Sequence, residues 1–432
     1  MSTLIRNAAV FRNNSIVENQ NIVIDGKYIK EFPDNPDPAD YDEVIEGNNM
    51  LCLPGLVNTH THVAMTLFRS YADDMELMDW LQNKIWPAED HLDDDIVYWG
   101  SMLAFAEMIR GGTTAFCDMY MFMDSCAKAA DLAGMRGNLA RGLAGIGPNG
   151  DKGLAENIEL FKNWDHAGDG RFKVMLGPHA SYTCPPDYIR KVRDAGMKYN
   201  IPIHIHLSET QGEVDNCLKE YGKTPIALMN DLGLFDLPTL PAHCVHVNDD
   251  DIRIMKEKDV HVAHNPTSNL KLASGIAPVT KMRAAGITVG LGTDGASSNN
   301  KLDMFAEMRL AARRNLCLIH KVKDSDPLAI NALEALNMAT VDGAKCMGYD
   351  NLGTLESGSL ADIILVNREG FNWMPGFNSI SLAVYSGNSM DVDTVMINGK
   401  VVMRHKELLT IDVERMKREV SRVTDKLFSF AG

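Results

Sequence analysis

The stretch LPGLVNTHTHV, residues 53–63, reads as a short apolar strand that ends in two histidines, His60 and His62. Residues two apart on a strand point to the same face, so both imidazoles face one side. A metal ion at about 2 Å from each imidazole nitrogen would fit that arrangement. Because an isolated His-x-His pair is weak evidence, the rest of the chain decides its meaning.

Seven further strand candidates follow, with helical stretches between most of them. They are TTAFCDMY (113–120), GNLARGLAG (137–145), FKVMLGPHA (172–180), IPIHIHLSE (201–209), TLPAHCVHV (239–247), DVHVAHNP (259–266) and TVGLGTDG (288–295). Eight strands with intervening helices predict parallel crossovers that close into a (β/α)8, or TIM, barrel. An open doubly wound sheet would alternate in the same way, but no GxGxxG follows a first strand.

The two chain ends differ from the middle of the chain because they contain short strand patterns joined by tight turns. NIVIDGKYIKEF (21–32) and TVMINGKVVMR (394–404) each carry a two-residue hairpin signal, Asp25-Gly26 and Asn398-Gly399. Neither end has enough strands for a stable core alone. We therefore expect one small β-sandwich domain built from residues 1–56 and 357–432, the latter with a terminal helix, around a barrel of residues 57–356.

Bulk composition narrows the class of protein. Of the 432 residues, 45% are hydrophobic and 23% are charged, which is ordinary for a globular protein. The net charge of −16 argues against a nucleic-acid partner, because phosphate binding needs a basic face. The eight cysteines form no CxxC pair, and no stretch is apolar enough to span a bilayer. We expect a cytoplasmic protein with no membrane partner; a homo-oligomer is compatible with these features.

Polar side chains lie at or just after the ends of the predicted strands. Because the carboxyl ends of barrel strands surround one mouth, residues far apart in sequence converge there. His206 suits a third neutral metal ligand, and Glu209, just past its strand, suits a proton shuttle. An isolated Asp in a turn is more often a helix cap or a turn residue. Asp294 becomes a candidate metal ligand only because the other polar residues converge at the same place. The converging set is His60, His62, His179, His206, Glu209, His243 and Asp294.

Five motifs together resemble the amidohydrolase superfamily, and more closely its 5-methylthioadenosine/S-adenosylhomocysteine deaminases. They are PGLVNTHTH (54–62), HIHLSET (204–210), PAHCVH (241–246), HNPTSNLKL (264–272) and LGTDGASSNN (291–300). The resemblance covers essentially the whole chain, including the split β domain. It implies hydrolytic deamination of the 6-amino group of an adenosine derivative by a metal-activated water.

The resemblance also implies roles for the converging residues. One divalent metal, usually zinc, would be bound by His60, His62, His206 and Asp294. His243 would orient the attacking water, and Asp294 would share its proton. Relatives with two metals carry a carboxylated lysine at the end of the fourth strand. Here that strand ends at His179 and Lys173 stands at its beginning, so a single metal is expected.

The substrate side of the site rests on the same resemblance. Glu89 would accept the ribose hydroxyls, although the residue alone reads as a surface glutamate; His179 would contact the base. Arg141 would face the amino-acid tail of S-adenosylhomocysteine. Gly153, with Lys152 beside it, stands where some relatives carry a second arginine. The expected substrates are therefore 5′-methylthioadenosine, S-adenosylhomocysteine, 5′-deoxyadenosine or adenosine, with the homocysteine carboxylate less firmly held.

Three alternatives stay open from the sequence. The same scaffold could carry a deaminase or dechlorinase of a free base or triazine, or a cyclic-amide hydrolase, which would open a ring without releasing ammonia. A barrel that only binds a ligand is also conceivable, since fold alone does not fix function. A different zinc deaminase design is excluded because it uses a PCxxC motif that this chain lacks.

Overall fold

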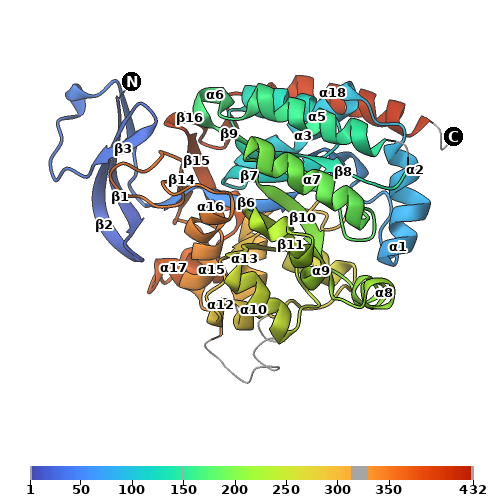
Figure 1. Ribbon diagram of the computed structural model, residues 1–432. Coiled ribbons are helices and arrows are strands. Elements are labelled where there is room, and N and C mark those ends of the chain that lie inside the picture. The colour runs from blue at the N-terminus through green and yellow to red at the C-terminus, as the bar shows by residue number, and fades with distance from the viewer. Residues whose placement is uncertain (1, 148, 313–328, 430–432) are drawn as a thin grey trace.

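The computed structural model describes residues 2–147, 149–312 and 329–429. Its centre is a barrel (Figure 1) formed by a sheet of eight parallel strands. The strands pair in sequence order, β6 beside β7 and onward to β13. The ring closes where the Asp294 N–H donates to the His60 carbonyl over 2.9 Å. The expected barrel is confirmed. Its strands are β6 Leu56–Thr61, β7 Thr113–Tyr120, β8 Arg136–Leu143, β9 Phe172–Pro178, β10 Ile203–Leu207, β11 Thr239–His243, β12 Val262–His264 and β13 Val289–Leu291.

Helices cover the outside of the barrel (Figure 1). The long α3 shows why they form where they do: the Asp93 side chain caps its first turn, and Gly111 follows its last residue, Arg110, as the C-cap. The main helices are α3 Asp94–Arg110, α4 Met123–Ala133, α5 Gly150–Trp164, α7 Pro186–Tyr199, α8 Gln211–Tyr221, α9 Pro225–Asp231, α10 Asp249–Glu257, α11 Pro266–Lys271, α12 Val279–Ala284, α13 Met304–Ala312, α15 Ala332–Met338, α16 Val341–Cys346 and α18 Val413–Leu427. Shorter helices, α1 Leu77–Trp80 and α2 Trp86–Glu89, follow the first barrel strand.

Both chain ends contribute to one mixed sheet beside the barrel (Figure 1). Its strands are β1 Ser2–Arg12, β2 Ser15–Asp25, β3 Tyr28–Glu31, β4 Glu43–Glu46, β5 Met50–Pro54, β14 Ile363–Asn367, β15 Val392–Ile397, β16 Lys400–Arg404 and β17 Glu407–Leu408. Both predicted hairpins are present, because β2 pairs with β3 and β15 with β16. The sheet is joined across the two ends where β5 pairs with β14. The boundaries at residues 56 and 356 remain a prediction.

A buried ion pair ties the small sheet to the barrel. Arg136, at the start of β8, donates two parallel hydrogen bonds of 2.8 and 2.9 Å to the carboxylate of Asp362. Its Nη2 also donates to the Asn398 side chain over 2.9 Å. Both charged side chains are fully buried, so each depends on the other for its neutralisation.

Two observations concern the described chain as a whole. Not one of its helices has the length and apolar character that crossing a membrane would take. The cysteines within the described ranges are all buried and carry free thiols.

Candidate active site

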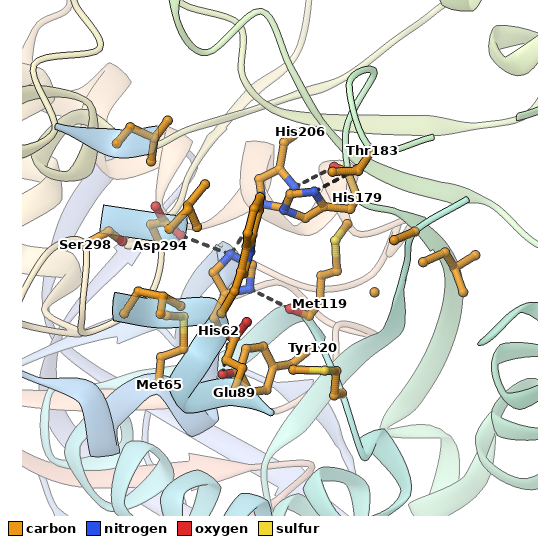
Figure 2. Close-up of a pocket in the computed structure, with 18 of the residues that line it drawn as sticks. His62, Met65, Glu89, Met119, Tyr120, His179, Thr183, His206, Asp294 and Ser298 are labelled. Carbon is orange, nitrogen blue, oxygen red and sulfur yellow. Dashed lines mark hydrogen bonds and ion pairs between the residues drawn. The ribbon is translucent and has the colours of Figure 1, made fainter. Parts of the chain in front are cut away.

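The carboxyl ends of the barrel strands surround a cavity of about 430 Å³. The predicted site residues converge there from six strands or their following turns, from α2 and from α5. His60 is fully buried and close to Asp294. The predicted residues that line the cavity are His62, Glu89, Arg141, Gly153, His179, His206, Glu209, His243 and Asp294. Figure 2 labels five of them, His62, Glu89, His179, His206 and Asp294.

Three imidazoles and one carboxylate form a compact cluster. The Nε2 atoms of His60 and His62 lie 3.4 and 3.3 Å from Asp294 Oδ1. The Nε2 atom of His206 lies 3.3 Å from that of His62. The ligand atoms of His60, His62 and His206 form one potential metal-binding group, and those of His60, His243 and Asp294 form another. The predicted ligands are therefore close enough together to share one ion.

The outer ring nitrogens of the predicted ligands His62 and His206 are hydrogen-bonded. His62 Nδ1 donates to the Met119 carbonyl over 2.5 Å, and His206 Nδ1 to the His179 carbonyl over 2.7 Å. A carbonyl accepts only, so each Nε2 keeps a lone pair that faces the cluster. Metal-binding histidines are commonly oriented in this way, by a hydrogen bond from the ring nitrogen that does not face the ion.

His60 is oriented through a second histidine. His204 Nδ1 donates to the Leu240 carbonyl over 2.7 Å, so its Nε2 accepts from His60 Nδ1 over 2.8 Å. His60 Nε2 is then a buried acceptor without a hydrogen-bond partner among the described atoms. Burial lowers the pKa of His60 and of His206 well below the usual range, which keeps both neutral. A neutral, unpartnered donor set of this kind fits a divalent cation.

Asp294 is held in a strained conformation beside these histidines. Its φ of 61° lies in the left-handed region, which costs free energy for a residue with a side chain. The Ser268 hydroxyl donates to Asp294 Oδ2 over 2.6 Å, and the Gly295 N–H donates to Oδ1 over 2.8 Å. These contacts fix the carboxylate with Oδ1 toward His60 and His62.

Glu209 and His243 form a second, adjacent pair of ionisable groups. Glu209 Oε2 lies 3.8 Å from His243 Nε2, and Glu209 Oε1 accepts from the Ser274 hydroxyl over 3.2 Å. Burial raises the pKa of Glu209, against the opposing effect of His243. Burial would lower the pKa of His243, but Glu209 and Asp294 outweigh it and raise that pKa. The pair is suited to holding and moving a proton.

The remaining wall is largely apolar, with a few polar groups. The Tyr120 hydroxyl donates to Glu89 Oε1 over 2.6 Å, and burial raises the pKa of Glu89 to about 7 (Figure 2). His179 Nδ1 lies 2.9 Å from the Thr183 hydroxyl. The apolar lining includes Leu77, Trp80, Leu81, Ile85, Trp86, Met119, Met121, Leu143, Ile146 and Leu272.

Arg141 is already paired at the cavity wall. Its Nε donates to Glu156 Oε2 over 3.0 Å, and Lys152 Nζ lies 3.7 Å from the other oxygen of Glu156. Gly153 lies inside α5, which begins at Gly150.

Sequence reasoning missed several side chains that hold the predicted ones. Asn269 Oδ1 lies 2.8 Å from His243 Nδ1, and Ser268 supports Asp294, yet both lie in the quoted motif HNPTSNLKL. Their short polar side chains on the first turns after a strand were the available signal. Tyr120 and Thr183, which hold Glu89 and His179, carried no distinguishing pattern.

Comparison with known proteins identifies the family to which the chain belongs. Residues 51–402 match the model of the Amidohydrolase family. The chain belongs to the amidohydrolase family. A protein of Dictyoglomus turgidum named 5-methylthioadenosine/S-adenosylhomocysteine deaminase is 49% identical to this amidohydrolase over 422 residues, 98% of each chain. One of Desulforudis audaxviator with the same name is 48% identical over 437 residues, 99% of each chain.

Solved structures agree with the fold. An adenosine deaminase from Xanthomonas campestris with bound zinc superposes with a TM-score of 0.92 at 30% identity, covering 99% of this chain and 98% of that one. Family membership and the His/Asp cluster together make this amidohydrolase a metal-dependent hydrolase with a site for a single metal ion.

Proposed function

We propose that this amidohydrolase hydrolyses the 6-amino group of an adenosine derivative, giving the inosine analogue and ammonia. The substrates proposed are 5′-methylthioadenosine, S-adenosylhomocysteine, 5′-deoxyadenosine and adenosine. Relatives at 45–50% identity that carry the name 5-methylthioadenosine/S-adenosylhomocysteine deaminase support this choice. One observation carries the proposal: Glu209 lines the same cavity as the candidate metal ligands but is not one of them.

The metal would be bound by His60, His62, His206 and Asp294. When bound, a divalent ion supplies a Lewis acid that lowers the pKa of water toward about 7. We propose zinc, because neutral imidazoles suit it and the similar adenosine deaminase structure contains it.

The proton steps belong to side chains of this chain. Glu209, whose pKa is raised by burial, donates a proton to ring N1 as water adds at C6. His243 holds the attacking water on one face of the ring, and Asp294 takes up the proton that the water loses as it adds. The Glu209 carboxylate then takes the proton of the new C6 hydroxyl, which becomes the carbonyl, and passes it to the amino group, which leaves as ammonia. The proton on Asp294 finally restores the acid form of Glu209.

The proposed substrate contacts use three side chains that line the cavity, Glu89, His179 and Arg141. Glu89 accepts hydrogen bonds from the ribose hydroxyls, and His179 contacts the purine. Arg141 faces the 5′-substituent, so its surroundings decide between neutral and charged substituents. The enzyme is further proposed to be cytoplasmic and to have no nucleic-acid partner. A homo-oligomer is compatible with the fold.

An ammonia assay tests the function. Purified protein is assayed on the four nucleosides, on adenine, on a triazine and on a cyclic amide, before and after chelation and after zinc is restored. We expect ammonia from the nucleosides only, lost on chelation and recovered with about one equivalent of zinc. Release from free adenine at the same rate, or ring opening without ammonia, would contradict the proposal.

A further inference from the structure

One buried carboxylate near the site is not used by the proposed chemistry. Glu213 lies in the first turn of α8, is 7% exposed, and is outside the residues that line the active-site cavity. Burying a charged group costs free energy unless hydrogen bonds compensate it. Burial raises the pKa of Glu213 to about 7, which reflects that cost. The contacts that compensate this cost indicate what Glu213 does in the fold.

The two oxygens of Glu213 bind two different turns. Oε2 accepts the backbone N–H of Glu209 over 2.9 Å. Oε1 accepts the hydroxyl of Ser181 over 2.8 Å. Ser181 stands two residues after His179, in the turn that follows β9, whereas Glu209 stands in the turn that follows β10. A single carboxylate therefore connects the turns that carry both side chains proposed to face the purine.

The turn at Glu209 needs such a restraint. Ser208, directly before it, has a φ of 52°, a left-handed conformation that is costly for a residue other than glycine. The Thr210 hydroxyl caps α8 by accepting the Glu213 N–H over 3.1 Å, which fixes the helix below the turn. The Glu213 carboxylate then reaches back and holds the Glu209 backbone, so that backbone strain is not relieved by rotation of the turn.

We propose that Glu213 is a positioning residue that fixes Glu209 relative to His179. The inference rests on the proposed function of these two residues. Glu213 does not touch substrate; it sets where the Glu209 carboxyl and the His179 ring stand. A displacement of about 1 Å in a catalytic group can cost about a hundredfold in rate. Loss of the Glu213 carboxylate should therefore lower kcat much more than it changes KM.

Three variants test the inference with the intact zinc-loaded enzyme. Glu213→Ala should lower kcat on 5′-methylthioadenosine by about 10- to 100-fold while keeping one metal per chain. Glu213→Gln should recover most of kcat, because an amide can accept from the Glu209 N–H and still pair with Ser181. Ser181→Ala, which cuts only the link to the His179 turn, should lose about 2- to 12-fold, the range of a single hydrogen bond. Glu220→Gln, the same change at an exposed position of α8, is the matched control and should behave as wild type.

A double variant separates positioning from a general structural role. Because Glu213 acts mainly through Glu209, Glu213→Ala in a Glu209→Gln background should cost no more than the 2- to 12-fold expected for the link to the His179 turn. Additive losses there, or failure of Glu213→Gln to recover kcat, would overturn the inference, and so would an unchanged kcat in Glu213→Ala. If Glu213→Ala does not fold, Ser181→Ala and Glu213→Gln decide the matter by the same criteria. Wild-type protein that releases no ammonia from any adenosine derivative would instead refute the proposed function itself.

Discussion

The Nε2 atoms of His62 and His206 lie 3.3 Å apart, although the two residues stand 144 positions apart in the sequence. Two nitrogens bound to one tetrahedral ion at about 2.0–2.1 Å stand about 3.3 Å from each other. In both residues Nδ1 carries the proton, because it donates to a backbone carbonyl. Each Nε2 atom then has only a lone pair, so the two Nε2 atoms form no hydrogen bond with each other. The pair is therefore arranged for a shared cation.

Removal of Asp294 should abolish metal binding and turnover together. In Asp294→Ala, the buried histidines lose the anion that balances the ion's charge. Elemental analysis after dialysis should find less than about a tenth of an equivalent of metal, and ammonia release should disappear. Asp250→Ala, at the exposed start of α10, is the control. Full activity with stoichiometric metal in Asp294→Ala would contradict the assignment.

Loss of the Ser268 hydroxyl should weaken the same site without destroying it. Ser268→Ala leaves Asp294 Oδ2 without the donor that lies 2.6 Å away. Loss of a hydrogen-bond partner that orients a metal ligand typically lowers metal affinity by about 10- to 100-fold. Competition with a chromophoric chelator measures the change, and excess zinc should restore most of kcat. Unaltered affinity would show that Ser268 is only a packing residue.

The strand ends of the barrel were predictable because two local patterns coincide there. Alternation of strands and helices gave the topology, and polar residues at the ends of apolar strands gave the mouth. His60 and His62 could be placed on one face of a strand from periodicity alone. His206 could be placed beside them only through the convergence of strand ends in a barrel. Asp294 could be placed only by analogy, since its direction depends on a left-handed backbone that a sequence does not reveal.

Contacts between separate turns were not predictable. Ser268 reaches Asp294 because α11 and the turn after β13 meet at the closed barrel. Glu156 reaches Arg141 because α5 folds back over β8. Each contact depends on helix rotation and on loop length, and a shift of one residue would remove it. The family resemblance predicted the residues proposed to bind metal or substrate. It did not predict the residues, such as Ser268 and Glu156, that hold those side chains in place.

Ionisation of Glu89 should appear in the pH dependence of catalysis. Burial raises the pKa of Glu89 from 4.5 to about 7, against the hydrogen bond from Tyr120, which lowers it. Below that pH the carboxyl is protonated and accepts ribose hydroxyls less well. For substrates with both hydroxyls, kcat/KM should rise as the pH passes upward through about 7.

Two variants isolate the contribution of Glu89. Tyr120→Phe removes the hydrogen bond that favours the ionised form, so the midpoint should move to higher pH. Glu89→Gln should remove this step from the profile and lower kcat/KM at high pH. A step that persists unchanged in Glu89→Gln would assign it to another group.

The ion pair between Arg136 and Asp362 should contribute strongly to stability. Both side chains are fully buried, so Asp362→Ala leaves an uncompensated cation between barrel and sheet. Breaking a buried pair in this way costs about 3–5 kcal/mol. Chemical denaturation should show this fall in the free energy of unfolding. Asp236→Ala, which breaks the exposed pair with Lys258, should leave it nearly unchanged. Equal effects of the two substitutions would refute the role given to the buried pair.

Glu156 should influence which 5′-substituents are accepted. Its carboxylate neutralises Arg141, the side chain proposed to face the end of the substituent, and Gly153 supplies no second cation there. Glu156→Gln should therefore favour an anionic substituent. The cleanest probe is an S-adenosylhomocysteine analogue that lacks the amino group, compared with 5′-methylthioadenosine. The ratio of their kcat/KM values should rise by about two- to fivefold, since a partly exposed ion pair is worth up to about 1 kcal/mol. Glu159→Gln, on the exposed face of the same helix, should leave the ratio unchanged. A ratio that falls in Glu156→Gln would mean that Glu156 orients Arg141 for the carboxylate instead of competing with it.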